Sequence, residues 1–191
     1  MNQALIVVDD FYDDPDALVA RARGLAYRRE PGVNYPGLTA DTFQDVPALM
    51  KRFATLLGGI EIKYRGAQGT FRIATEDDLK TRVSTVHIDS SDWSAVIYLN
   101  RAPLEGTSFY RHRRLDLTYV SPEQHRRPEV QGAIARDTLD PDAWEHLYEI
   151  PMKYNRLVIF DGKYFHSGAR GLPGAGAAEG RMTQNFFFHR A

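Results

Sequence analysis

His87 and Asp89 are separated by one residue at the end of a predicted strand, Arg82 to His87. In an extended chain, residues i and i+2 project from the same face, so this imidazole and this carboxylate can bind one metal ion. A polar turn follows, and the apolar run Ser94 to Leu99 predicts the next strand. The pattern alone is weak, because a histidine that simply pairs with a nearby aspartate explains it better than a metal site does.

A third candidate ligand, His166, lies near the other end of the chain. Predicted strands at Arg156 to Asp161 and Tyr164 to Ser167 place His166 at a strand end, where it is either a packed core histidine or a ligand facing a cavity. With His87 and Asp89 it would supply two imidazoles and one carboxylate. Such a set leaves three positions of an octahedral ion open, as in non-haem Fe(II) oxygenases.

A candidate anion-binding group, Arg181, opens the β-rich segment Arg181 to Phe188. Alternation along a strand places Arg181, Thr183 and Asn185 on one face and the residues between them on the other. A guanidinium beside a hydroxyl can clamp a carboxylate, because arginine presents a planar pair of donors. A surface arginine at the start of a strand is the alternative interpretation.

The elements that must position these residues begin with two helices, over about residues 10–58. The first starts with the cap Asp13 to Pro15 and continues to about Arg29. The second starts at Pro47, and the pair Gly58-Gly59 ends it. Both carry an apolar stripe with helical spacing, so we expect them to pack on one face of a sheet.

From about residue 60 the pattern changes to the two-residue period of strands. Two late helical segments are predicted, one that starts at Pro122 to Gln124 and one after Asp140, with Trp144, Leu147 and Tyr148 on one face. Helices followed by many short strands favour a two-layer β-sandwich or barrel with N-terminal helices, with its β core at about residues 60–190. The predicted strands are Ala4–Val8, Ile60–Tyr64, Gly69–Thr75, Arg82–His87, Ser94–Leu99, Thr107–Tyr110, Asn155–Phe160, Tyr164–Ser167 and Met182–Phe188.

Composition limits the class of protein. A chain of 191 residues with 43% hydrophobic residues can bury one core, so a single domain over residues 1–191 is expected. A net charge of −1 gives no general attraction to nucleic acid or to an anionic membrane. The sequence has no cysteine, which excludes disulfides and thiol catalysis and fits the cytoplasm. The apolar run at Ala4 to Val8 is too short for a signal peptide or a spanning helix.

The chain resembles the 2-oxoglutarate- and Fe(II)-dependent dioxygenases, in the branch of the prolyl 4-hydroxylases, over about Gly69 to Phe188. The resemblance implies a double-stranded β-helix, or jelly roll, and the cofactors Fe(II) and 2-oxoglutarate. It implies that His87, Asp89 and His166 bind iron. The motifs that carry it are VHID (86–89), AVIYLN (95–100), EGTSFY (105–110), LVIFDGKYFHSG (157–168) and RMTQNFFF (181–188).

The same resemblance implies that Arg181 and Thr183 hold the distal carboxylate of 2-oxoglutarate. Tyr98 would donate a hydrogen bond to this co-substrate, although a tyrosine in the core explains its position equally well. The spacing from His166 to Arg181 is longer than usual in the family, because residues 171–180 form an apparent insertion. Arg170 is therefore the alternative anchor, but it lacks a strand to direct it.

The implied function is hydroxylation, with O2, of an unidentified small molecule or peptidyl side chain. Two basic runs, Arg111 to Arg114 and His125 to Arg127, are either solvated faces or recognition sites for an anionic substrate. The net charge argues against nucleic acid as a partner. The alternatives are a non-oxidative Zn or Mn metalloenzyme and a non-catalytic binding module on a jelly-roll fold.

Overall fold

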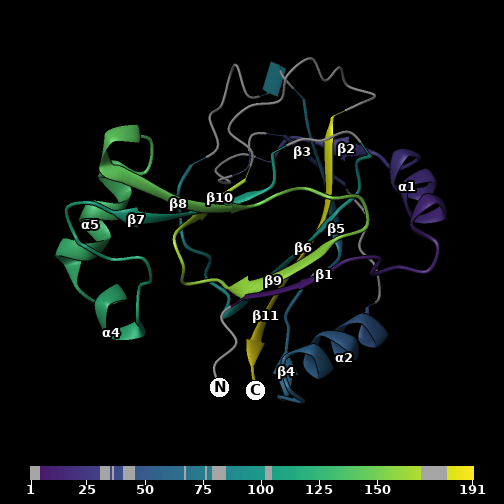
Figure 1. Ribbon diagram of the computed structural model, residues 1–191, viewed down its shortest axis with the longest axis horizontal. Coiled ribbons are helices and arrows are strands. Elements are labelled where there is room, and N and C mark those ends of the chain that lie inside the picture. The colour runs from purple at the N-terminus through teal and green to yellow at the C-terminus, as the bar shows by residue number, and fades with distance from the viewer. Residues whose placement is uncertain are drawn as a thin grey trace.

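The computed structural model describes residues 5–30, 35, 37–40, 46–66, 68–75, 77–78, 85–101, 105–168 and 180–191. This part of the chain is mostly β, with few helices and with antiparallel pairing throughout (Figure 1). The helices are α1 (Pro15–Arg23), α2 (Pro47–Leu56), α4 (Pro122–His125), α5 (Pro128–Asp137) and the short 3-10 helix η1 (Pro141–Ala143). The strands are β1 (Leu5–Val8), β2 (Tyr27–Arg28), β3 (Leu38–Ala40), β4 (Ile62–Lys63), β5 (Thr70–Ala74), β6 (Trp93–Tyr98), β7 (Thr107–His112), β8 (Trp144–Ile150), β9 (Leu157–Asp161), β10 (His166–Ser167) and β11 (Arg181–Arg190).

Two sheets form the frame of the molecule. The larger has the strand order β1-β9-β6-β11-β5-β3-β2, and β4 pairs with the end of β11. The smaller has the order β10-β7-β8, and a bridge between His87 and His166 adds the segment around His87 to its edge. The predicted mainly β class with N-terminal helices is confirmed. None of the helices in the described residues has the length and hydrophobicity needed to span a lipid bilayer.

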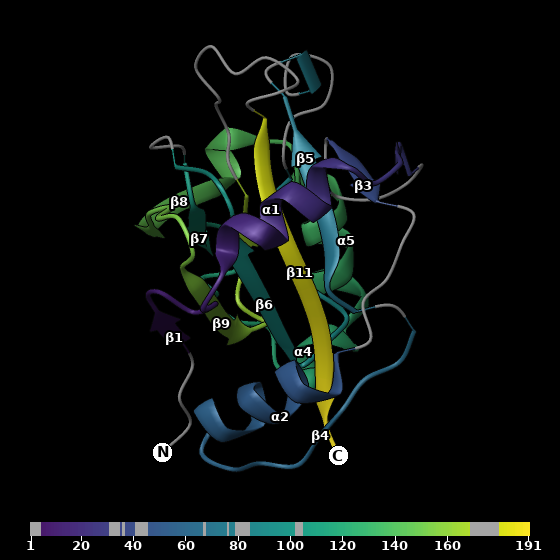
Figure 2. The same cartoon turned by 90° about the vertical axis from the view of Figure 1, so that its right-hand side faces the viewer.

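The main hydrophobic core lies between the N-terminal helices and the larger sheet. In Figure 2, α1 and α2 lie across the face of the sheet that contains β11 and β6. Phe53 of α2 stacks on Phe188 and meets Phe186 edge-on, and both rings belong to β11. Met182 joins the same core, while Arg181, Thr183 and Asn185 point to the opposite face, so the predicted alternation of β11 is confirmed.

The ends of the two N-terminal helices have clear local causes. The Asp14 side chain accepts a hydrogen bond from the Ala17 amide, and proline occupies the first turn of each helix. Gly58 and Gly59, at φ of 85° and 79°, end the second helix as predicted. The predicted extension of the first helix to Arg29 is wrong. It ends at Gly24, because residues 27–28 pair with β3 as strand β2.

The helix predicted after Asp140 is also wrong. Asp140 caps one 3-10 turn by accepting a hydrogen bond from the Asp142 amide, and the chain then becomes strand β8. Trp144 is buried, while Leu147 and Tyr148 are exposed at 41% and 43%. The apolar spacing resembled a helix, but the segment pairs with β7 from Trp144 to Ile150 instead.

The remaining predicted strands are found with small shifts of their ends. The strand predicted at Ile60–Tyr64 is reduced to the two residues of β4, and helix α5 was not predicted. Three segments of the sequence analysis lie outside the described residues: most of the strand Arg82–His87, the alternative anchor Arg170, and the apparent insertion up to residue 179.

Candidate metal centre and adjoining cavity

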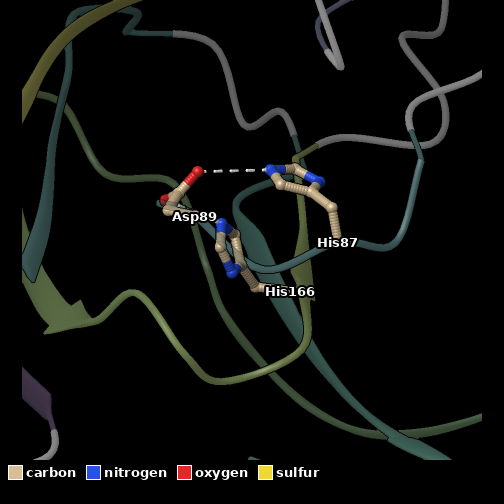
Figure 3. Close-up of side chains that lie close together, drawn as sticks. All are labelled: His87, Asp89 and His166. Atoms are coloured by element: carbon tan, nitrogen blue, oxygen red, sulfur yellow. Dashed lines mark ion pairs between the residues drawn. The ribbon is translucent and has the colours of Figure 1, made fainter. Parts of the chain in front are cut away.

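The side chains of His87, Asp89 and His166 converge from two segments that are far apart in the sequence (Figure 3). Their potential ligand atoms all lie within 4.8 Å of one another. The His166 Nε2 atom lies 3.3 Å from Asp89 Oδ2, and the His87 Nε2 atom lies 3.7 Å from Asp89 Oδ1. The structure thus brings together the three residues that the sequence analysis selected as ligands.

Backbone pairing sets this convergence. The His87 amide donates to the His166 carbonyl at 3.0 Å, and the His166 amide donates to the His87 carbonyl at 2.9 Å. The Asp89 amide donates to the carbonyl of Gly162, the residue that follows β9. A reciprocal bridge of this kind places two side chains directly opposite each other on adjacent strands. Their imidazole ring centroids are accordingly 4.5 Å apart.

The hydrogen bonds of both imidazoles select the tautomer that a metal requires. Nδ1 of His87 contacts the Thr85 carbonyl at 2.8 Å, and Nδ1 of His166 contacts the Tyr164 carbonyl at 2.8 Å. Because a carbonyl can only accept, each Nδ1 carries a proton, so Nε2 is the atom whose lone pair is available to a metal when the ring is neutral. Both lone pairs face the Asp89 carboxylate. This orientation of the histidines by backbone carbonyls is typical of metal ligands.

The electrostatics of the three groups are strongly coupled. Burial lowers the pKa of His87 to about 4, and the neighbouring His166 adds to this effect, so His87 is neutral at pH 7. Burial opposes ionisation of Asp89, but His166 and the hydrogen bond from Ser94 hold the Asp89 pKa below its usual range. Burial also opposes the charge on His166, yet Asp89 raises the His166 pKa. The centre therefore keeps a carboxylate charge that a cation could neutralise.

The donor set fits a divalent cation. Ligand atoms at right angles, each about 2.1 Å from an ion, are about 3 Å apart, slightly less than the separations here. Two nitrogen donors and one oxygen donor suit iron, zinc or manganese. Among the described residues, no other group of three or more His, Asp or Glu side chains has this geometry. His112 is fully buried against Asp137 and lies outside this group.

Gly162 packs closely against Asp89, so a side chain at position 162 should displace Asp89. A Cβ atom at Gly162 would lie 2.6 Å from the Ser91 carbonyl oxygen and 3.1 Å from the Asp89 Cβ. We expect Gly162→Ala to lower the free energy of unfolding by about 1–3 kcal/mol and to weaken metal binding, because the backbone must move. Chemical denaturation and metal titration measure the two effects.

The matched control is Gly132, in the middle of α5, where an added Cβ meets nothing within 4 Å. Gly132→Ala should raise the free energy of unfolding by about 1 kcal/mol through helix propensity and leave metal binding unchanged. A Gly162→Ala variant with normal metal affinity would contradict the role given to this contact.

A cavity of about 440 Å³ adjoins the three residues, on the face of the larger sheet opposite the helices. This volume lies in the range of small-molecule sites. The three polar residues predicted on one face of β11, Arg181, Thr183 and Asn185, all line the cavity. Apolar side chains, including Val96 and Phe160, complete its wall.

Arg181 is 5% exposed and is held rigidly. Its Nε donates to the Glu105 carbonyl and its Nη2 donates to the Gly106 carbonyl, each at 3.1 Å. Its guanidinium lies over the Tyr98 ring, 5.6 Å from the centroid. The Tyr98 hydroxyl contacts Thr107 Oγ1 at 2.7 Å, and Tyr98 does not itself line the cavity. Tyr98 therefore packs beneath Arg181.

Three further polar residues of the site were not selected from the sequence. Ser94 donates to Asp89, and Tyr35 and Arg72 line the cavity. Arg72 lies between apolar residues in a predicted strand, which would usually indicate a solvent-facing side chain. In the structure, the Arg72 side chain instead faces the cavity and forms part of its wall. Arg72 pairs with Thr183 on the neighbouring strand and shares its face, and this register is not visible in the sequence.

The first basic run serves a structural purpose. Asp137, 8% exposed, pairs with Arg114, with Arg136 and with the buried His112. Arg111 pairs with Asp116 and Glu145. These cations are thus matched by carboxylates, as expected for a solvated face with internal pairs.

Several solved structures share this fold at low sequence identity. SnoN, a non-heme alpha ketoglutarate dependent epimerase from nogalamycin biosynthesis, has a TM-score of 0.57 and 14% identity, covering 100% of this chain and 80% of SnoN. HygX from Streptomyces hygroscopicus, with nickel and 2-oxoglutarate bound, has a TM-score of 0.54 and 13% identity, covering 98% of this chain and 83% of HygX. An oxidoreductase of the 2OG-Fe(II) oxygenase family from Burkholderia pseudomallei has a TM-score of 0.52 and 13% identity, covering 98% and 85%.

The fold is therefore that of the 2-oxoglutarate- and iron-dependent oxygenases. The chain itself belongs to DUF6445, a family of unknown function, whose model matches residues 1–188. Among curated proteins, none matches this sequence.

Proposed function

We propose that this protein is an Fe(II)- and 2-oxoglutarate-dependent oxygenase that hydroxylates a small molecule or a peptidyl side chain. The observation that carries the proposal is the convergence of His87, Asp89 and His166, with both Nε2 lone pairs facing the carboxylate, at a cavity that contains a buried arginine. A candidate metal site and a buried arginine in the same cavity favour this chemistry more strongly than either feature would alone.

The strand order supports a single domain with a double-stranded β-helix at its centre. The strands β5-β11-β6-β9 are adjacent in the larger sheet. Opposite them, the segment at His87 is followed by β10-β7-β8 in the smaller sheet. Four strands in each of two facing sheets, with the ligands at one end, suit a jelly roll whose core spans about residues 60–190. The helices within about residues 10–58 support it from outside.

The roles of the residues follow from their positions. His87, Asp89 and His166 would hold Fe(II), and Arg181 with Thr183 would hold the distal carboxylate of 2-oxoglutarate. When bound, iron and co-substrate supply the oxidising power: O2 is reduced, 2-oxoglutarate loses CO2 to become succinate with one oxygen atom, and a substrate C–H bond becomes C–OH with the other. The chain contributes orientation and a cavity sheltered from water.

Anaerobic titration tests the proposal. Adding 2-oxoglutarate to the Fe(II)-loaded protein should produce a metal-to-ligand charge-transfer band, and admitting O2 should give slow, uncoupled succinate formation. Binding of Zn2+ or Mn2+ without any response to 2-oxoglutarate would favour a non-oxidative metalloenzyme. Absence of both metal binding and succinate would favour a binding module.

A further inference from the structure

A second cation, Arg72 of β5, faces the same cavity and has no evident structural task. Its Nε atom is buried and has no hydrogen-bond partner. Among the described residues, no carboxylate forms an ion pair with it, whereas most of the other arginines described above are matched by acids. Its guanidinium lies over the rings of Tyr35 and Phe187, at 5.1 and 5.4 Å from their centroids. Aromatic faces attract a cation but accept no strong hydrogen bond.

The cost of this arrangement suggests that it is retained for a ligand. Burial lowers the pKa of Arg72, although the negative charges of Asp89 and Glu30 partly offset the effect. Arg72 in turn contributes to the lowered pKa of His87, so its charge acts on the metal centre. An unpaired buried charge destabilises a folded protein unless something compensates it. Strained or unsatisfied groups of this kind are concentrated at functional sites.

Counting charges indicates what would compensate Arg72. A divalent ion, Arg72, Arg181 and Asp89 together leave three positive charges around the cavity. The dianion 2-oxoglutarate neutralises two of them, at the metal and at Arg181. One positive charge then remains, on Arg72.

Resting on the function proposed above, we propose that Arg72 and Tyr35 form a second anion-binding subsite that recognises a singly charged carboxylate of the hydroxylated substrate. The Tyr35 hydroxyl is buried and has no hydrogen-bond partner, so it is free to donate to the same carboxylate. Arg72 presents a planar pair of donors suited to bidentate contact. The substrate would thus be a carboxylic acid, positioned between this subsite and the metal.

Binding measurements with simple probes test this assignment. The probes are acetate, phenylacetate and N-acetylglycine, each compared with its uncharged amide, titrated under argon into protein saturated with Fe(II) and 2-oxoglutarate. At least one acid should bind about 10-fold or more tightly than its amide, and Arg72→Gln should remove that preference. Tyr35→Phe should reduce it by a smaller factor. Arg72→Gln should lower the affinity for 2-oxoglutarate far less than the roughly 30- to 1,000-fold expected for loss of an anchoring arginine.

The inference would be overturned if no acid were preferred over its amide, or if the preference survived Arg72→Gln. It would also be overturned if Arg72→Gln weakened 2-oxoglutarate binding by about 30-fold or more. The last would make Arg72 part of the co-substrate site. Phenyl phosphate is included as a further probe, and tighter binding of this anion than of any carboxylate would overturn the assignment to a carboxylate.

Thermal unfolding separates a binding role from a structural one. Removing an uncompensated buried charge should raise the midpoint, so Arg72→Met, without ligands, is expected to unfold about 2–4 °C higher. The matched control is Arg156, whose side chain is 17% exposed and pairs with Asp9, so Arg156→Met should unfold at a lower temperature. A lowered midpoint for Arg72→Met would show that Arg72 is structural and would overturn the inference.

Failure of the proposed function is distinguishable from failure of this subsite. If the wild type binds no 2-oxoglutarate in the presence of Fe(II), the proposed function fails. The acid and amide probes are then titrated into metal-free Arg181→Gln protein, where Arg72 remains as the guanidinium among the described lining residues. If the Arg181→Gln protein binds the acid more tightly than the amide, and the double variant Arg181→Gln/Arg72→Gln does not, the subsite is supported independently. Equal affinities overturn it.

Discussion

Replacing Asp89 by asparagine is expected to lower the affinity for Fe(II) or Mn(II) by at least about 100-fold and to abolish succinate formation. The amide keeps the shape of the side chain but removes the one negative charge that His87 and His166 face. Breaking a buried charge interaction typically costs about 3–5 kcal/mol, which corresponds to a change of about two to four orders of magnitude in affinity. Direct metal titration of purified protein measures the loss.

The same variant can be assayed by unfolding. At a metal concentration 100 times the dissociation constant, the wild type should gain about 2.7 kcal/mol of stability, or roughly 5–10 °C for a chain of this size. Asp89→Asn should show almost no shift at that concentration. The control is Asp137→Asn, which removes another carboxylate beside a buried histidine and should lower stability without changing the metal-induced shift. A normal shift in Asp89→Asn would contradict its assignment as a ligand.

The candidate metal ligands His87 and Asp89 could be selected from the sequence because the signal is local. The spacing of His87 and Asp89 requires only an extended backbone to place both side chains on one face. The alternation of β11 likewise follows from one strand and fixed the faces of Arg181 and Met182. What joins His166 to His87 is non-local, since it depends on a backbone bridge between distant segments. The family resemblance supplied that step.

Other features depend on tertiary context that no local pattern contains. Residues 144–150 have helix-like apolar spacing, but the available partner strand β7 decides in favour of β8. In the sequence Arg72 looks like a surface residue of a strand, but in the structure it lines the cavity and lies over the Tyr35 ring. The predicted hydrogen bond from Tyr98 to the co-substrate remains a prediction, and the hydroxyl currently contacts Thr107. Its ring, beneath Arg181, suggests support for that guanidinium instead.

Replacing Arg181 by glutamine is expected to weaken 2-oxoglutarate binding by about 2–4 kcal/mol, or about 30- to 1,000-fold. Arg181 is nearly fully buried and presents a rigid guanidinium to the cavity. Glutamine can still donate to one of the two carbonyls that arginine holds, so the local backbone should be disturbed less than by alanine. Titration of 2-oxoglutarate into Fe(II)-loaded protein under argon gives the affinity.

If Arg181 binds the distal carboxylate of 2-oxoglutarate, Arg181→Gln should weaken the binding of 2-oxoglutarate and leave metal binding unchanged. Metal affinity without 2-oxoglutarate should stay within about two-fold of wild type, because the three ligands belong to other segments of the chain. Arg156→Gln, which alters an ion pair with Asp9 outside the cavity, should leave the affinity for 2-oxoglutarate unchanged. Unchanged 2-oxoglutarate affinity in Arg181→Gln would move the anchor to another cation of the chain, with the metal assignment intact. Loss of affinity for both metal and co-substrate would instead indicate that the variant disturbs the whole sheet.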